Sequence, residues 1–525
     1  MPNCSNPGLT ARHGGDSVKM DRFPRTSSDR LYARPGFAVP FRPFLLPALL
    51  LTAALMALSG RAAGASPAAG TSQGLLPLPV RQALSTSGIP PESVAIWVQG
   101  VDAEQPRLAF NAGQALNPAS VMKLVTAFAA FERLGPAHSW STRFVTRADV
   151  RDEVLQGDLH VVGGGDPVLG YERLWKLLRR LRAQGINRIA GDIVLDGSVL
   201  ALPEHDPEAF DGRGLRPYNS GPHGLLLNYN TQQLLLFPGT SPGAPVTVVA
   251  EPPLAGVIID NRLTTSPAAC TLWYRDLDAR IETGMEGDTH LRLLGSLPGS
   301  CGPRTWSAAP LSPAGYGTAL VAALWQEVGG TLAGRVRQGH TPAGGRTLFS
   351  EDSPPLADVA RDMNKWSSNV IARQLLATLS PADESDMVAG GARIAREQLV
   401  AAGIADTGLV IENGAGLSRM ERIRAETLGR LLLTVWQRPW MPEYLATLPV
   451  AGVDGTARKR LAGSRARGQA HIKTGTLNGV RAIGGYVLDH AGRRHAVVML
   501  INHPEAAAGQ AAQDALLEWV WAGTP

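Results

Sequence analysis

The chain has 525 residues, 44% of them hydrophobic and 18% charged, which is typical of a globular protein with two or three domains. Its net charge of +5 would suit a nucleic-acid or membrane-surface partner. Residues 1–65, however, carry eight Lys/Arg and three Asp/Glu, so the remainder carries 42 of each sign (50 − 8 and 45 − 3). Because the excess charge lies in this leader, we expect no nucleic-acid partner.

The N-terminal segment has the features of an export signal. Basic residues precede an almost wholly apolar run at 44–58, and small residues ending at Ala65 follow it. The run is short for a membrane-spanning helix and contains a proline. We predict a signal peptide over residues 1–65 that is cleaved near Ala65, and a periplasmic mature protein, with peripheral membrane association left open. Met1 and Met20 are alternative starts.

Cysteine usage agrees with export. Cys270 and Cys301 are the two cysteines outside the leader, and an even pair in an oxidising compartment predicts a disulfide bond. Two free buried thiols are the alternative. No Cys/His spacing in the sequence is typical of a zinc site, so we expect no metal and no other cofactor.

Two strands, at 93–99 and 107–110, are predicted to lead into a helix over 117–135 with a wide apolar face. Ser120 lies at the start of this helix and Lys123 one turn further on. Side chains three apart on a helix meet, so the hydroxyl and the amine can hydrogen-bond. Apolar neighbours would lower the pKa of the amine and make it a base. The alternative is a capping serine and a lysine that extends to solvent.

The character of the chain changes from about residue 140. Strand patterns at 154–162, 188–195 and 232–237 are separated by Pro- and Gly-rich breaks, with a helix pattern at 171–184. We interpret 141–309 as an insertion that is mostly β in its second half and consists of two nested subdomains.

Helical patterns resume at 312–328 and 356–379, and the polar segment 364–369 predicts a bend within the second. Three strand patterns and a final helix follow near the C-terminus, at 471–477, 481–488, 495–501 and 504–521. These elements predict an α+β fold in which residues 75–140 and 310–525 form one discontinuous domain, an antiparallel sheet flanked by helices.

Three short motifs occur in order: Ser120-Val-Met-Lys123, Ser367-Ser-Asn369 and Lys473-Thr-Gly475. Such a trio is typical of penicillin-binding proteins and class A β-lactamases. Each motif alone is weak. Together, at a predicted helix start, a bend between helices and an edge strand, they indicate a serine acyl-transfer site.

Beyond the trio, the chain resembles the class C, type-4 penicillin-binding proteins, the D-alanyl-D-alanine carboxypeptidase/endopeptidases of peptidase family S13. The resemblance covers nearly the whole mature chain, and further segments carry it: Gly157–Pro167, Gly191–Ser198, Phe210–Asn219, Asn413–Arg419 and Leu448–Thr456. It implies a penicillin-binding/serine β-lactamase-like transpeptidase domain. The chain departs from the family pattern at Ser368, where Asp is usual, and at Asn413 and Ala415, where Asp and Ser are usual.

The resemblance also implies roles for the motif residues. Ser120 attacks the carbonyl between two D-alanines, with Lys123 as base. Ser367 relays a proton to the leaving D-alanine, Asn369 holds the amide of the acyl side, and Lys473 supplies positive charge.

The rest of the site follows from the same resemblance. Thr474 and Thr476 offer hydroxyls to the terminal carboxylate of the substrate, and the strand at Gly475 admits the peptide. Asp166 and Arg419 match positions that face the charged side chain of the stem peptide. A turn aspartate and a surface arginine are the alternatives for these two.

We therefore predict a serine-type DD-carboxypeptidase and DD-endopeptidase. Its partners would be peptidoglycan peptides that end in D-Ala or are cross-linked through it, with β-lactam antibiotics as inhibitors. A β-lactamase and a non-catalytic cell-wall-binding scaffold are the alternatives. The sequence gives neither the oligomeric state nor the balance of the two activities.

Overall fold

The computed structural model describes residues 75–284 and 287–523. The predicted signal peptide at 1–65 lies outside this part of the chain. Within 75–284 and 287–523, no helix combines the length and the apolar character needed to cross a membrane.

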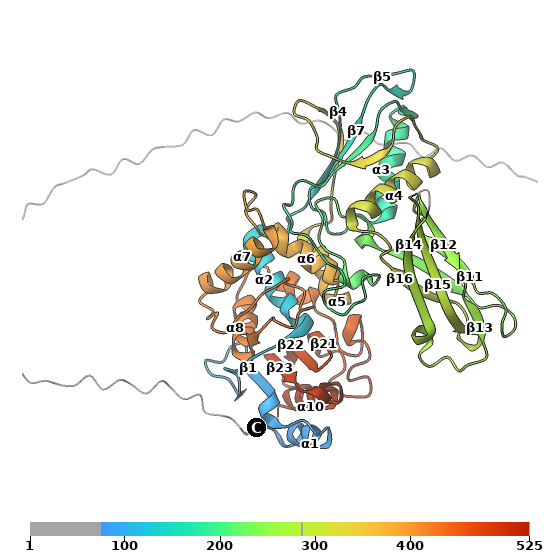
Figure 1. Ribbon diagram of the computed structural model, residues 1–525. Coiled ribbons are helices and arrows are strands. Elements are labelled where there is room, and N and C mark those ends of the chain that lie inside the picture. The colour runs from blue at the N-terminus through green and yellow to red at the C-terminus, as the bar shows by residue number, and fades with distance from the viewer. Residues whose placement is uncertain (1–74, 285–286, 524–525) are drawn as a thin grey trace, which may run out of the picture. The chain divides into compact units, whose positions relative to one another are not determined.

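A five-stranded antiparallel sheet brings together strands from both ends of the described chain (Figure 1). Its order is β2-β1-β23-β22-β21, with β1 (Val94–Gly100), β2 (Leu108–Phe110), β21 (Ala470–Leu477), β22 (Val480–Leu488) and β23 (Arg494–Asn502). Strand β1 pairs with β23 from Val94–Ile501 to Gly100–His495. Strand β21 ends this order and therefore forms an edge of the sheet.

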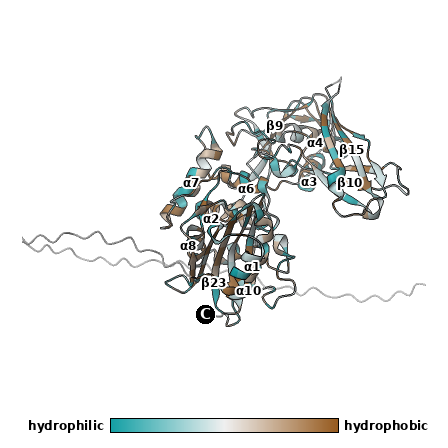
Figure 2. Cartoon of the chain, turned by 60° about the horizontal axis from the view of Figure 1, so that its bottom comes forward, coloured by the Kyte–Doolittle hydropathy of each residue, from teal (hydrophilic) through white to brown (hydrophobic). Residues whose placement is uncertain are grey.

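Alternation along β23 separates two hydrophobic cores, because successive side chains of a strand point to opposite faces. Val498 and Leu500 belong to one core, and Val497 and Met499 to the other. Figure 2 shows the hydrophobic colouring on the strands around β23.

The two cores take their helices from different parts of the chain. The first contains residues of α2 (Lys123–Leu134), α5 (Leu356–Trp366), α6 (Asn369–Thr378), α7 (Met387–Ala401), α8 (Ala425–Trp436) and α9 (Met441–Thr447); the second contains residues of α1 (Leu78–Thr86) and α10 (Gln510–Trp521). This antiparallel sheet with helices on both faces confirms the predicted α+β class.

Separate sheets form between β4 and β19. Two of them have the orders β18-β9-β7-β4-β19 and β17-β8-β6-β5, and two more have the orders β11-β10-β16 and β12-β15-β13, with β14 added to β15. The strands of the first pair are β4 (Ser141–Thr146), β5 (Val150–Arg151), β6 (Val154–Leu155), β7 (Leu159–Val162), β8 (Arg188–Ile189), β9 (Ile193–Asp196), β17 (Thr331–Leu332), β18 (Val336–Gln338) and β19 (Arg346–Asp352). Those of the second pair are β10 (Gln232–Phe237), β11 (Thr247–Glu251), β12 (Val257–Asn261), β13 (Thr264–Ser266), β14 (Leu277–Thr283), β15 (Thr289–Pro298) and β16 (Arg304–Ala308).

The sheets of the inserted region continue past residue 310, the predicted domain boundary. Helix α4 (Pro313–Glu327) shares a core with α3 (Tyr171–Ala183), and β19 pairs with β4, so these sheets extend to Asp352. The apolar face of α4 shows that the helix is buried, but it does not show against which core. Helical periodicity alone therefore could not place this boundary.

Cys270 and Cys301 are joined by a disulfide bond. Cys301 belongs to the core that Leu234, Leu236 and Leu293 build in the β-rich part of the insertion. The bond therefore closes a 31-residue separation within one small core.

Candidate active site

Ser120 lies in a tight turn at the start of the buried helix. A 3-10 segment, Ala119–Met122, precedes α2, and Ala119 has a φ of 45°, in the left-handed region. Asn117 fixes this turn: its side-chain oxygen accepts the Ala119 N–H at 2.8 Å and its amide donates to the Ser418 carbonyl at 2.8 Å. An alanine with positive φ is strained, and such strain persists only where surrounding bonds impose it. The turn thus holds the half-buried Ser120 hydroxyl in place.

Lys123 is fully buried next to this hydroxyl. Its ammonium nitrogen lies 3.0 Å from Ser120 Oγ and 2.8 Å from Asn369 Oδ1, and it also donates to the Ala415 carbonyl. The structure therefore brings the first and second motifs together at one nitrogen.

The electrostatics at Lys123 favour a neutral amine. Burial lowers the pKa of Lys123 well below its ordinary value, and the nearby charges of Lys473 and Arg373 lower it further, while Glu421 opposes this shift. A neutral amine 3.0 Å from a serine hydroxyl can accept its proton.

The second and third motifs also meet. Ser367 ends α5 in the left-handed conformation, with a φ of 59°, and its hydroxyl accepts a hydrogen bond from Lys473 Nζ at 2.9 Å. Lys473 also donates to the Thr474 carbonyl at 2.8 Å, and burial lowers the pKa of Lys473 to about 7. This ammonium can thus hold or release its proton near neutral pH.

The departure at Ser368 has a structural explanation. Ser368 is the N-cap of α6, and its hydroxyl accepts the Ile371 N–H at 3.3 Å. Serine and aspartate are both strong N-cap residues, so either side chain can begin this helix. Asn369 is then the first helical residue, and its side chain reaches Lys123.

At Gly475 the edge strand β21 passes close to the turn that holds Ser120. A Cβ at this position would lie 2.5 Å from the Pro118 carbonyl oxygen and 3.1 Å from the Ser120 nitrogen. Only glycine permits so close an approach. On either side of it, Thr474 Oγ1 lies 2.8 Å from Thr456 Oγ1, and Thr476 Oγ1 accepts from Arg481 at 2.7 Å.

Sequence reasoning did not single out Glu421. This carboxylate is fully buried, and Oε1 accepts backbone N–H groups from Glu412, Asn413 and Gly414 at 3.1–3.2 Å. These bonds fix the turn whose next carbonyl, on Ala415, receives the Lys123 amine. Among the described residues, Oε2 has no hydrogen-bond partner. No short motif marks a single buried glutamate, so only the fold reveals it.

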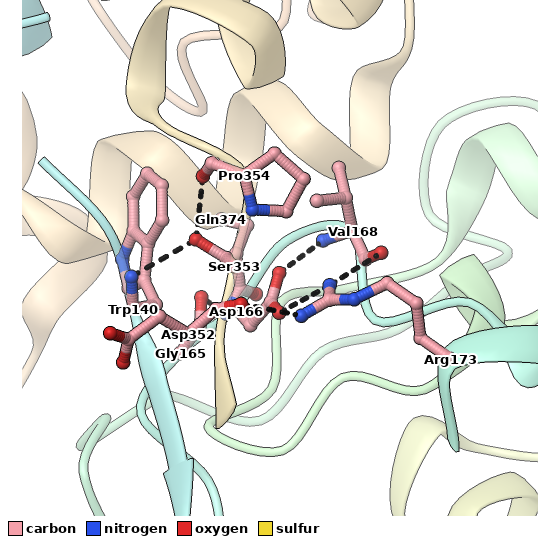
Figure 3. A network of polar contacts seen from close by, with 9 residues as sticks. All are labelled: Trp140, Gly165, Asp166, Val168, Arg173, Asp352, Ser353, Pro354 and Gln374. Carbon is pink, nitrogen blue, oxygen red and sulfur yellow. Dashed lines mark hydrogen bonds and ion pairs between the residues drawn. The ribbon is translucent and has the colours of Figure 1, made fainter. Parts of the chain in front are cut away.

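Asp166 lies within an internal network (Figure 3). Its side chain is 2% exposed; Oδ1 accepts the Val168 N–H at 2.8 Å and Oδ2 pairs with Arg173 at 2.8 Å. Next to it, the Gly165 carbonyl accepts from Gln374 of α6 at 2.9 Å. Both carboxylate oxygens thus have protein partners, which favours the turn-aspartate interpretation.

Arg419 is exposed beside the turn between β21 and β22. It donates to the Asn478 carbonyl at 2.9 Å, and its guanidinium lies 5.0 Å from the centroid of the Phe210 ring. Phe210 and Tyr218 belong to one loop of the inserted region, and the Tyr218 carbonyl accepts from Asn369 at 3.3 Å. One loop therefore spans the site from Asn369 to Arg419.

The chain is similar to several known proteins. The D-alanyl-D-alanine carboxypeptidase of Actinomadura sp. (strain R39) is 29% identical over 424 residues, which cover 77% of each chain. The crystal structure of penicillin binding protein 4 (dacB) from Haemophilus influenzae superposes with a TM-score of 0.70 at 23% identity, covering 84% of this chain and 99% of that one. The same protein complexed with a novel β-lactam gives a TM-score of 0.67, with the same identity and coverage.

The fold is therefore that of the penicillin-binding peptidases. The D-Ala-D-Ala carboxypeptidase 3 (S13) family matches residues 79–522, and the chain belongs to that family. It is accordingly a serine-type hydrolase of family S13.

Proposed function

We propose that the protein is a periplasmic DD-carboxypeptidase and DD-endopeptidase that cleaves peptidoglycan stem peptides and cross-links through an acyl-enzyme and is inhibited by β-lactams. The observation that carries this proposal is the fully buried Lys123 amine, which lies 3.0 Å from Ser120 Oγ and 2.8 Å from Asn369 Oδ1. A buried amine bonded to a serine hydroxyl is an activated nucleophile pair.

Acylation begins when Lys123 takes the proton of the Ser120 hydroxyl. The oxygen then attacks the carbonyl carbon of the penultimate D-alanine, and the backbone N–H groups of Ser120 and Thr476 stabilise the oxyanion. Such a donor typically contributes about 2.7–4 kcal/mol. The close packing of Gly475 on the Ser120 nitrogen supports this assignment, because it places β21 beside the nucleophile.

Collapse of the oxyanion breaks the C–N bond, and Ser367 delivers its proton to the leaving amine while it receives the proton that Lys123 took from Ser120. Lys473, 2.9 Å from Ser367 Oγ, orients this hydroxyl and attracts the carboxylate of the leaving D-alanine. The hydroxyls of Thr474 and Thr476 also bind that carboxylate. Water then attacks the acyl-enzyme carbonyl and gives a proton to Lys123, which passes it to Ser120 Oγ as the ester bond breaks and the acid product leaves.

The acyl half of the substrate lies along the edge of β21 as an added strand. Asn369 holds its amide, and Arg419 faces its charged side chain. The exposure of Arg419 beside β21 and its contact with Phe210 support this role. Asp166, enclosed by its own partners, contributes only indirectly, by holding the turn next to α6.

Intact-mass spectrometry after incubation with benzylpenicillin, followed by peptide mapping, tests this function. We expect one stable penicilloyl adduct on Ser120 and none in Ser120→Ala. Penicillin consumed without an adduct would identify a β-lactamase, and untouched penicillin without an adduct would identify a non-catalytic scaffold. Hydrolysis of a D-Ala-D-Ala pentapeptide by Ser120→Ala would refute the mechanism.

A further inference from the structure

The inserted region contains a cavity apart from the catalytic trio. Its volume is about 1180 Å³, and its walls come from the loop at 202–216, the segment 274–281 and the start of α4. This volume is large enough for several residues or sugar rings.

Positive charge dominates the lining. Four arginines line the cavity, at positions 213, 216, 275 and 280, against two carboxylates, Glu208 and Asp278. Asp278 is neutralised by Arg280 at 3.0 Å, which leaves three arginines against Glu208.

Two of these arginines are available to a ligand. Across 75–284 and 287–523, neither the Arg213 nor the Arg275 side chain makes a hydrogen bond or an ion pair, and both are exposed. A guanidinium presents a planar fork of donors that matches a carboxylate.

Aromatic rings stand beside these donors. Tyr274 is 47% exposed on the cavity wall, and Trp306 lies under Arg216, with 5.1 Å between the guanidinium and the ring centroid. Apolar ring faces next to hydrogen-bonding groups suit a sugar, whose own faces are apolar and whose edges carry hydroxyls.

The same loop joins this cavity to the catalytic site. Arg213 and Arg216 line the cavity, while Phe210 contacts Arg419 and the Tyr218 carbonyl accepts from Asn369. The loop that lines this basic, aromatic cavity therefore also reaches the candidate active site, so a polymer bound there could extend to the cavity.

We propose that this cavity binds an anionic stretch of peptidoglycan, a glycan chain with its stem-peptide carboxylates, remote from the bond that is cut. Arg213 and Arg275 pair with the carboxylates, and Tyr274 packs on a sugar ring. The proposal deepens the proposed function and rests on it, since it concerns the polymer to which the scissile peptide is attached.

The test uses the full mature chain and a soluble probe, glycan chains that carry tripeptide stems. Such stems lack D-Ala-D-Ala, so the probe is bound without being cleaved. Titration calorimetry compares the wild type with the double variant Arg213→Gln/Arg275→Gln. We expect the Kd of the double variant to rise about tenfold or more, because both charge-assisted contacts to the carboxylates are lost.

The matched control is Arg143→Gln/Arg188→Gln. Both residues are exposed in the inserted region, outside the cavity, and the change in charge is the same. We expect its Kd to stay close to that of the wild type, and thermal unfolding checks that both double variants are folded. Equal weakening by the two double variants, or no binding by the wild type, would overturn the proposal. The benzylpenicillin adduct on Ser120 separately reports the proposed function, so the two failures are distinguishable.

Discussion

Lys473 Nζ lies 2.9 Å from Ser367 Oγ, although the two residues are 106 positions apart in the sequence. Ser367 ends a helix in the left-handed conformation, and Lys473 lies on the edge strand of the central sheet. The proton relay of the proposed mechanism thus depends on a contact between the end of α5 and β21, and this contact gives a first prediction.

Burial lowers the pKa of Lys473 to about 7, so the side chain is charged below that pH and neutral above it. If the ammonium attracts the terminal carboxylate, kcat/KM for a D-Ala-D-Ala pentapeptide falls as the pH rises through about 7. Lys473→Arg stays charged over this range, so its kcat/KM should be lower than that of the wild type but should not fall as the pH rises through about 7. An activity that stays level up to pH 9 in the wild type would contradict the role.

Lys123→Ala should slow acylation of Ser120 by benzylpenicillin by about 10²–10⁴-fold, because the variant loses its general base. Stopped-flow fluorescence or quenched mass spectrometry measures this rate. Lys176→Ala, an exposed lysine on α3, is the matched control and should acylate at the wild-type rate. Equal rates in the two variants would show that another group takes the proton.

Glu421→Gln keeps an acceptor for the three backbone N–H groups but removes the charge. Since Glu421 raises the pKa of Lys123, the variant should lower that pKa further and move the acidic limb of the acylation rate to lower pH. Glu421→Ala leaves three N–H groups without this acceptor, and that of Gly414 is buried, so the variant should also destabilise the fold by about 1–3 kcal/mol for this buried group. If the pH dependence of the acylation rate is the same in Glu421→Gln as in the wild type, Glu421 has only a structural role.

Ser368→Asp should preserve both the stability of the protein and its acylation rate, because aspartate also caps a helix. Ser368→Ala removes the hydroxyl that accepts the Ile371 N–H and should lower the free energy of unfolding by about 1 kcal/mol. Thermal unfolding of the three proteins makes the comparison. A large loss of acylation in Ser368→Asp would mean that position 368 acts in chemistry.

Arg419→Ala should reduce hydrolysis of a stem peptide by about tenfold or more, while acylation by a simple β-lactam, which lacks the charged side chain, changes little. The ratio of the two rate constants is the readout, and Arg188→Ala is the control. An equal loss of both activities would show that Arg419 stabilises the site as a whole and does not bind the charged side chain.

Asp166→Asn, by contrast, should lower the thermal stability of the protein, because it weakens the ion pair of Asp166 with Arg173.

From the sequence, the helices and strands around the three motifs could be predicted better than the tertiary contacts between them. A spacing of three on a helix anticipated the contact of Lys123 with Ser120, and the structure shows it at 3.0 Å. Strand β10 and the bend between α5 and α6 also lie where the residue pattern placed them. These features depend on local periodicity and turn chemistry, which a single sequence carries.

What the sequence did not reveal depends on tertiary packing. Glu421 is a buried counter-charge whose partners are backbone groups, and Asp166 has Arg173 as an internal partner. The sheets of the inserted region continue past residue 309 to Asp352, because β19 pairs with β4. A hydrophobic pattern states that a face is buried but not which neighbour covers it.

The pairing of β1 with β23 also has a consequence for the order of synthesis. Ser120 and Lys123 are made early, but Ser367 and Lys473 follow much later, and β1 meets β23 only when residues 494–502 exist. Each contact across such a separation must wait for nearly the whole chain, since long-range strand pairing is slow and comes late. Ser120 and Lys123 therefore lack Ser367 and Lys473 while the chain is incomplete, and the proposed mechanism predicts that a product truncated before residue 473 would be inactive.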